Sequence, residues 1–382
     1  MLLVALAPKS PIFGLGIRLP NQDPIATARG NAFAATADNA SAIYYNPAGI
    51  AQLEQPELRV SAYSVRVDNE YRSNGAQIDN EAEWQHVPAI YFASPIEDRR
   101  MSWGISVNVP YGQSSEWPED APFNSIGVEG EVRYLSVSPA IAAKVNDWLY
   151  LGGAVHFDSA ELELQQVLPL TTLRTRVEGD SFAVSGTFGA LMRFDAHSIG
   201  LTYRFQTIHD VDGKVKVPGV GQFDYRSKVT FPDHLILGYA YRIGNWTLEA
   251  NVDWTAWSKF DNLDLGVAGT LPFEWQNSFF YEIGAQWASS DGATRINFGY
   301  TFNENSIPDE FFNPLIVDSD RHFLSAGLEQ ALSETWTVSA TVQYGWSVDR
   351  KVKDAIGNGF QDPNGEYSTR IIAFNVGVNA RF

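Results

Sequence analysis

The stretch WTVSATVQYGWSV (Trp336–Val348) alternates between apolar and polar residues with a period of two. Successive side chains of a β-strand point to opposite faces, so this pattern predicts a strand with one apolar and one polar face. The same alternation returns in WTLEANVDW (246–254), in RINFGYTF (295–302) and in IAFNVGVNARF (372–382). The sequence therefore predicts an all-β protein from about residue 57 onward.

The connections between the expected strands alternate between short and long along the whole chain. The fourteen expected strands are 57–68, 84–94, 101–109, 128–143, 148–161, 180–195, 197–207, 228–243, 245–257, 275–288, 294–303, 321–331, 335–349 and 368–382. Short periplasmic turns and long extracellular loops are typical of an outer-membrane barrel, whereas a soluble two-sheet sandwich has no reason to sort its connections in this way. We therefore predict a 14-stranded antiparallel transmembrane β-barrel over residues 55–382.

Composition agrees with a barrel without proving one. Charged residues make up 19%, aromatic residues 13%, and the mean hydropathy is −0.18. Soluble domains carry about 25% charged residues, and a helical span needs about 18 consecutive apolar residues, which the chain lacks. The absence of cysteine excludes disulfides and thiolate metal sites. The net charge of −18 argues against a nucleic-acid partner.

Aromatic residues near strand ends are the second sign of a membrane barrel. Such residues form girdles at the lipid headgroups, although aromatic residues also favour strands in general. The chain ends in Phe382, on the lipid-facing register, and this resembles the C-terminal aromatic residue of bacterial outer-membrane proteins. The tryptophans that we expect in the girdles are Trp246, Trp254, Trp257, Trp275, Trp287, Trp336 and Trp346.

The residues before the barrel differ from the strands. GNAFAATADNASAIYYNPAGIAQL (Gly30–Leu53) is rich in small residues and almost uncharged. A barrel of this width must be filled or it conducts water, so we expect residues 14–54 to form an N-terminal hatch that plugs the barrel. The first residues, MLLVALA, look like the end of a signal peptide, so we expect export and treat residues 1–13 as a leader.

Residues 14–53, GLGIRLPNQDPIATARGNAFAATADNASAIYYNPAGIAQL, resemble the hatch of the FadL/TodX family of outer-membrane transporters for long-chain fatty acids and aromatic hydrocarbons. The triplet Asn46-Pro47-Ala48 matches the hatch motif of that family, with Asp38 and Ser41 before it. The resemblance implies a Gram-negative outer membrane, passive uptake and a gate formed by these five residues. It also implies that extracellular loops catch the ligand, that a lumen pocket holds it beside the start of the hatch, and that it leaves sideways through a gap at a kinked third strand.

Prolines interrupt the second to fourth expected strands. Pro110 ends the third strand in VNVPYG, Pro88 lies in the second and Pro139 in the fourth. Proline cannot donate a ladder hydrogen bond, so we predict a lateral opening at Pro88, Pro110 and Gly112. The alternative is that these prolines mark strand ends and bulges, which would account for Pro139 and for Pro88.

Two groups of apolar residues are candidates for ligand contact. Leu162, Leu164, Leu168 and Leu170 fall in an expected loop, 162–179, where exposed apolar side chains mark an interaction site or pack on the barrel rim. The few apolar residues with an inward register are Phe280, Phe323 and Ile371. The charged residues with an inward register are expected to pair and brace the hatch rather than line a pore. They are Glu249, Asp253, Glu282, Glu329, Arg204, Arg242, Arg295 and Arg381.

The chain shows no catalytic or metal-binding motif, and we expect neither an enzyme nor a cofactor. Its six histidines are scattered. The acidic pairs Asp309/Glu310 and Asp318/Asp320 could bind Ca²⁺ or meet lipopolysaccharide through divalent ions, or they are solvated loop charges. Three functions stay open: a monomeric transporter of a hydrophobic ligand in contact with lipid and lipopolysaccharide, a receptor or adhesin that uses the barrel as a scaffold, and a general porin.

Overall fold

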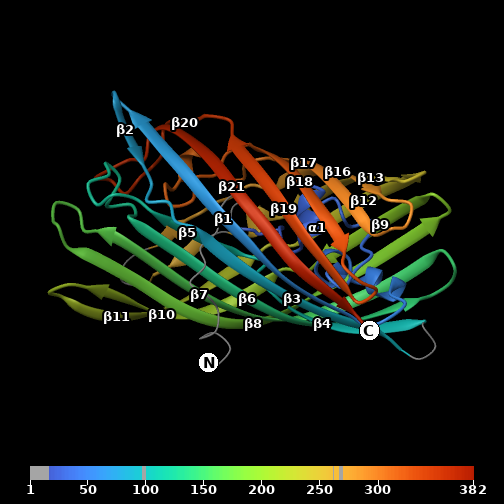
Figure 1. Ribbon diagram of the computed structural model, residues 1–382. Coiled ribbons are helices and arrows are strands. Elements are labelled where there is room, and N and C mark those ends of the chain that lie inside the picture. The colour runs from blue at the N-terminus through green and yellow to red at the C-terminus, as the bar shows by residue number, and fades with distance from the viewer. Residues whose placement is uncertain (1–16, 97–99, 261, 266–269) are drawn as a thin grey trace.

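A computed structural model describes residues 17–96, 100–260, 262–265 and 270–382, and the leader predicted at 1–13 lies outside them. Fourteen of the described strands close into one antiparallel barrel, which confirms the predicted fold (Figure 1). The last strand pairs with the first, from Glu57↔Arg381 to Arg72↔Glu366. The barrel strands are β1 (Glu57–Ser73), β3 (Gln85–Pro95), β4 (Met101–Asn108), β6 (Glu129–Lys144), β7 (Leu149–Val167), β8 (Arg174–Phe194), β9 (His197–Arg204), β12 (His234–Ile243), β13 (Trp246–Thr255), β16 (Ser278–Ala288), β17 (Thr294–Asn303), β18 (Arg321–Ala331), β19 (Trp336–Ser347) and β21 (Gly365–Arg381).

The alternating pattern places apolar residues outside and polar residues inside. In β19 the side chains of Val342 and Tyr344 are exposed, whereas Gln343 between them is 2% exposed. Phe382 is exposed at the barrel end, as predicted. The outer face is apolar because it meets lipid, while the inner face packs on other parts of the chain. None of the helices among the described residues is long and apolar enough to cross a membrane.

Several predicted loops are instead strands that extend the barrel wall beyond the apolar band. The loop assignments at 162–179 and 208–227 were wrong. The β7–β8 ladder runs on to Val167↔Arg174. Apolar and charged residues keep alternating above the apolar band, so the hairpins remain paired. The additional strands of the wall are β2 (Ala76–Asp79), β5 (Gly112–Glu116), β10 (Thr207–Val217), β11 (Gly221–Phe231) and β20 (Arg350–Val352). A separate two-stranded sheet consists of β14 (Asn262–Asp264) and β15 (Thr270–Pro272). The hairpins β7–β8 and β10–β11 reach farthest to the left in Figure 1.

The tryptophan prediction is correct for part of its set. Trp246 and Trp336 are exposed on the outer face near strand ends. Trp257 and Trp275, however, are 0% and 3% exposed and belong to a buried apolar cluster. Both lie in the connection between β13 and β16, which folds inward and covers its aromatic rings. Trp257 starts the short helix η3 (Trp257–Lys259), and a further short helix is η5 (Asp309–Phe311).

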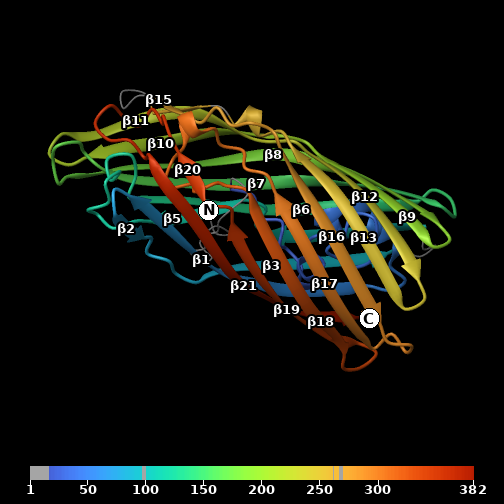
Figure 2. The same cartoon turned by 90° about the horizontal axis from the view of Figure 1, so that it is seen from above.

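Residues 17–53 lie inside the ring of strands, and Figure 2 shows parts of their blue ribbon between the nearer and farther strands of the barrel. Their helices are short: α1 (Pro24–Ala28), α2 (Ala42–Tyr45) and η2 (Pro47–Gln52). The side chain of Asp23 caps α1 by accepting hydrogen bonds from the backbone N–H groups of Ile25 and Ala26, and Pro24 at the first helical position needs no partner. Local capping thus lets a compact, largely uncharged segment fill the lumen.

Candidate functional site

The triplet Asn46-Pro47-Ala48 attaches the hatch to the barrel wall. The Nδ2 group of Asn46 donates to the carbonyl of Ala34 in the hatch at 2.8 Å and to that of Ala190 in β8 at 3.0 Å. Its Oδ1 atom accepts from the N–H of Ala48 and so caps η2, in which Pro47 is the first residue. One buried amide therefore joins two hatch turns and one strand.

The two other predicted gate residues lie in different surroundings. Ser41 is fully buried, and its hydroxyl donates to Oδ1 of Asn39 at 2.6 Å within the same turn. Asp38, by contrast, is exposed. Ser41 thus shapes the turn before α2, whereas Asp38 is not part of the contact that Asn46 makes with the wall.

The hatch packs on inward-facing glycines of the wall, which the sequence analysis missed. A Cβ atom added to Gly152 of β7 would lie 2.5 Å from the backbone N of Ala48, and one added to Gly284 of β16 would lie 2.7 Å from the carbonyl oxygen of Arg29. Only glycine allows backbone to approach backbone so closely. We call this set the glycine belt: Gly104, Gly152, Gly189, Gly200, Gly238, Gly284, Gly299, Gly327 and Gly377.

A signal for the glycine belt was present in the sequence. Its members occupy inward positions on nine of the fourteen barrel strands, and six of them face one another across the ladder, in Gly152↔Gly189, Gly200↔Gly238 and Gly284↔Gly299. Glycine weakens an ordinary strand, so its repeated use on one face indicates a close backbone contact.

Buried ion pairs hold the hatch from the sides, and this confirms the predicted bracing for Glu249 and Asp253. Glu329, Arg295 and Arg381 instead pair within the wall. Arg29 pairs with Glu249 of β13 at 2.7 Å, and the same carboxylate accepts from the N–H of Ala35 at 2.6 Å. Asp23 pairs with Arg59 of β1 at 2.9 Å. Removing one partner of such a pair leaves a buried charge and costs about 3–5 kcal/mol. The hatch from Asp23 onward is thus fixed to several strands at once.

The barrel wall is interrupted at its third strand. The β3–β4 ladder ends at Ile90↔Val107, and β5 then pairs with β6 from Gly112↔Arg133. Pro110 lies in the kink between β4 and β5, Gly112 follows it, and Pro88 lies on β3 just beyond the end of the ladder. Within the described residues, the part of β3 from Gln85 to Ala89 pairs with β1 on one side, and no strand pairs with it on the side of the kink. We call this place the wall gap.

The leading segment of the hatch, residues 17–22, lies inside the wall gap. Leu19 N–H donates to the carbonyl of Pro110, and Gly112 N–H donates to that of Ile17, each at 2.8 Å. Arg18 pairs with Asp253 of β13 at 2.6 Å. Burial opposes the charge of Arg18, but the attraction and hydrogen bond of Asp253, together with Tyr44 and Tyr111, raise the pKa of the guanidinium, which therefore stays charged.

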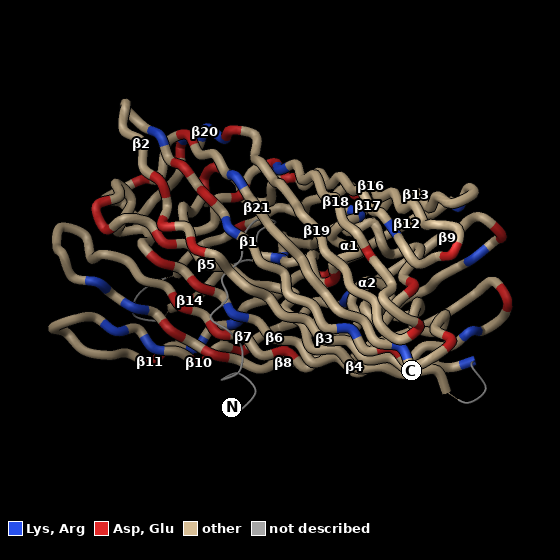
Figure 3. The backbone as a smooth tube through the Cα atoms, in the orientation of Figure 1, with Lys and Arg blue, Asp and Glu red and all other residues tan. Residues whose placement is uncertain are grey.

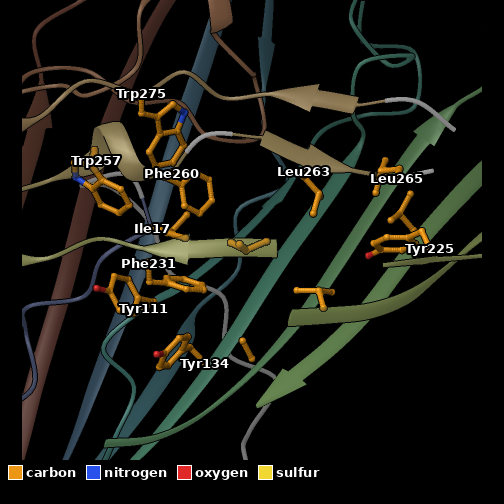
Figure 4. Close-up of a cluster of buried hydrophobic side chains, with 14 of the residues drawn as sticks. Ile17, Tyr111, Tyr134, Tyr225, Phe231, Trp257, Phe260, Leu263, Leu265 and Trp275 are labelled. Atoms are coloured by element: carbon orange, nitrogen blue, oxygen red, sulfur yellow. The ribbon is translucent and has the colours of Figure 1, made fainter. Parts of the chain in front are cut away.

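At Ile17 the leading segment enters an apolar region that we call the outer cluster (Figure 4). Figure 4 shows Ile17 between Phe260 and Phe231, and Leu162 and Leu164 pack against the cluster from the inner face of β7. It encloses a cavity of about 90 Å³ with almost entirely apolar walls. The rings and chains at its centre are Tyr111, Tyr134, Tyr225, Phe231, Trp257, Phe260, Leu263, Leu265 and Trp275.

Below the leading segment lies a second apolar region, the inner cluster. Phe280, Phe323 and Ile371 meet there around Leu19. Val87 and Val109, which border the wall gap, belong to the same cluster, and a cavity of about 20 Å³ adjoins it. The leading segment thus separates the outer cluster at Ile17 from the inner cluster at Leu19.

Two predicted ligand contacts and the acidic loops lie elsewhere. Leu168 and Leu170 lie in the turn of the β7–β8 hairpin, and the side chain of Leu170 is 93% exposed. Asp309 pairs with Arg350 at 2.7 Å, which gives this loop carboxylate a structural role. Among the described residues, no group of three or more potential ligands is arranged to hold a metal ion.

Comparison with known proteins places this geometry in a family. Residues 15–382 match the model of the outer membrane protein transport proteins (OMPP1/FadL/TodX). A long-chain fatty acid transport protein of Salmonella typhi is 24% identical over 81% of this chain and 82% of its own length. A FadL homologue of Pseudomonas aeruginosa shares the fold, with a TM-score of 0.84 at 18% identity over 96% of this chain and all of the other. The Pseudomonas putida toluene transporter TodX superposes with a TM-score of 0.72 at 14% identity over 94% of this chain and 98% of its own. The chain belongs to the OMPP1/FadL/TodX family of outer-membrane transport proteins.

Proposed function

We propose that this protein carries hydrophobic molecules, long-chain fatty acids or aromatic hydrocarbons, across the outer membrane by passive diffusion. Relatives are named long-chain fatty acid transport protein and toluene transporter, which supports this substrate range. The observation that carries the proposal is the position of residues 17–22 between the outer cluster and the inner cluster. In this proposal residues 14–54 form the hatch, and its leading segment is the gate.

We propose that the gate has two states, a closed state with the leading segment in place and an open state with it displaced. In the closed state Ile17 and Leu19 fill the apolar space on either side of the segment. A ligand that occupies this space gains about 25 cal/mol for each Å² of apolar surface that it buries, and it shifts the equilibrium toward the displaced segment only if it binds that state better. Displacement of Leu19 would remove its bond to Pro110 and join the inner cluster to the wall gap.

The exit is proposed to be lateral, at Pro88, Pro110 and Gly112. The glycine belt and the ion pairs of Arg29 and Asp23 fix the rest of the hatch, whereas among the described residues the wall gap is covered by side chains and by the leading segment. A hydrophobic molecule is also more stable in lipid than in the aqueous periplasm. A porin needs an open lumen, which the hatch fills, so the geometry favours the transporter.

Uptake of radiolabelled oleate and toluene tests this function directly. In cells that lack their own transporter, expression of the chain should raise the initial uptake rate of at least one of them about tenfold, because facilitated entry replaces the barrier of the outer membrane. Cells with the empty vector are the control, and a folded barrel in the outer membrane is verified by its heat-modifiable band. Uptake of neither compound by cells with a folded barrel would favour the receptor or adhesin.

We propose further that the barrel is a monomer and that the outward face of its long hairpins contacts lipopolysaccharide. Figure 3 shows charges of both signs along these hairpins, beyond the apolar band. Arg133, Glu161 and Asp212 are among the residues that line a hollow of about 710 Å³ there. Carboxylates can bind divalent ions that also bind lipid phosphates. Native mass spectrometry should show monomers that release lipopolysaccharide on addition of EDTA; dimers or lipid-free monomers would contradict this.

A further inference from the structure

We infer that Gln22 is the residue that closes the wall gap in the resting state, because its side chain takes the place of a neighbouring strand. This inference rests on the proposed function, since it concerns the regulation of the same gate. Gln22 is 2% exposed and lies between the hatch, the kink and the barrel wall.

The side-chain amide of Gln22 binds both the N–H and the carbonyl of one wall residue, Val109, as a residue of a neighbouring strand would. Its Nε2 group donates to the carbonyl of Val109 at 2.7 Å, and its Oε1 atom accepts from the N–H of the same residue at 3.2 Å. The β3–β4 ladder ends two residues before this point, at Val107. Val109 would otherwise present an unpaired donor and acceptor in a buried place, at a cost of about 1–3 kcal/mol for each group.

The same amide also ties the leading segment to the kink. Its second Nε2 hydrogen goes to the carbonyl of Leu19 at 2.9 Å. Three hydrogen bonds thus use the amide group and join Leu19, Val109 and Gln22 into one unit. Only glutamine and asparagine side chains carry such a paired donor and acceptor, and asparagine is one methylene shorter.

The backbone of Gln22 is bound both to the leading segment, since its N–H donates to the carbonyl of Pro20 at 2.9 Å, and to parts of the chain outside that segment. Its N–H donates to the hydroxyl of Tyr45 at 3.0 Å, and its carbonyl lies 3.4 Å from the hydroxyl groups of Ser61 and Tyr91. Asp23, the next residue, is fixed by Arg59. Within the leading segment Gln22 is therefore the fixed end, about which residues 17–20 move. Its side chain holds them to the kink, while the hydroxyl groups of Tyr44 and Tyr45 hold the carbonyls of Leu19 and Pro20 to the hatch.

Amide hydrogen exchange in the Gln22→Met variant tests this role. Methionine has a similar length but cannot form the three hydrogen bonds. The exchange rate of the Val109 N–H should rise at least about tenfold, since a bond of about 1.4 kcal/mol corresponds to this factor. A rise confined to the kink supports the inference. An unchanged rate at Val109 would overturn the inference, because Gln22 then does not protect this N–H. An equal rise throughout β16–β19 would also overturn it, because the substitution then lowers the stability of the whole barrel.

Gln52→Met is the matched control, because Gln52 also donates from a half-buried amide but bonds to hatch carbonyls of Thr36 and Ala37. It should leave the exchange of Val109 unchanged. Uptake gives the second measurement: the half-saturating ligand concentration should fall about threefold or more in Gln22→Met, because the open state is more populated. Hydrogen exchange reports on the bonds of Gln22 to Val109 even if neither oleate nor toluene is transported. Failure of this inference and failure of the proposed function are therefore distinguishable.

Discussion

Replacing Gly152 by alanine is expected to lift the hatch from the wall and to reduce uptake about tenfold. The new Cβ atom would lie 2.5 Å from both the backbone N of Ala48 and the carbonyl carbon of Pro47. Both atoms belong to backbone and cannot turn away as a side chain would. Overpacking of this kind costs about 1–3 kcal/mol. Movement of η2 would also weaken the bond from Asn46 to Ala190 in the adjacent strand.

Gly153→Ala is the matched control for Gly152→Ala. Gly153 is the next residue of β7 and points to the opposite face, where an added Cβ atom would meet only the carbonyl oxygen of Thr187 at 3.5 Å, an ordinary contact. Planar-bilayer conductance should rise in Gly152→Ala, because water enters beside a displaced hatch, and should stay at the wild-type level in Gly153→Ala. Equal behaviour of the two variants would show that the hatch does not depend on the glycine belt.

Linking the leading segment to the kink by a disulfide is expected to stop transport. Arg18 and Tyr111 face each other as a non-hydrogen-bonded antiparallel pair, flanked by the bonds of Leu19 to Pro110 and of Gly112 to Ile17. The Cα atoms of such pairs lie about 4.5 Å apart, within the range of disulfides. The chain contains no other cysteine. The oxidised Arg18→Cys/Tyr111→Cys variant should lose uptake about tenfold or more relative to its reduced form, because residues 17–19 can no longer leave the wall gap.

Reduction of the same double variant provides the reference, because both substitutions also alter the gate itself. Uptake should recover on addition of a reducing agent, and each single-cysteine variant should not respond to oxidation. The redox state is read from the mobility of the unboiled protein. Continued transport by the fully oxidised protein would exclude displacement of the leading segment as the gating step.

The hatch has two parts with different roles: one part is fixed to the wall, and the other is proposed to move. Asp23 to Leu53 is held by buried ion pairs, by Asn46 and by close backbone contact with many strands. Residues 17–22 lie in a different environment, between two apolar clusters and against an interrupted strand. Rigid support of the larger part lets a small displacement of the shorter part act on the wall rather than on the whole plug.

The sequence by itself determined the barrel, its strand count, the inward or outward direction of residues in its clearly alternating strands and the family that its hatch resembles. These properties follow from local periodicity, from the order of short and long connections and from the triplet Asn46-Pro47-Ala48. The direction of Phe280, Phe323 and Ile371 followed from the same alternation, and the structure brings these three together around Leu19.

Only the tertiary structure decided which residues meet across the lumen. Three features depend on contacts between positions far apart in the chain. They are the glycine belt, the bonds of Gln22 to Val109 and the cluster that buries Trp257 and Trp275. Alternation fixes the face of a side chain, but the height at which it meets the hatch depends on the stagger between strands, which closure of the barrel imposes. The hairpins at 162–179 and 208–227 were mistaken for loops for a related reason, since pairing across strands, rather than the end of an apolar run, decides where a strand stops.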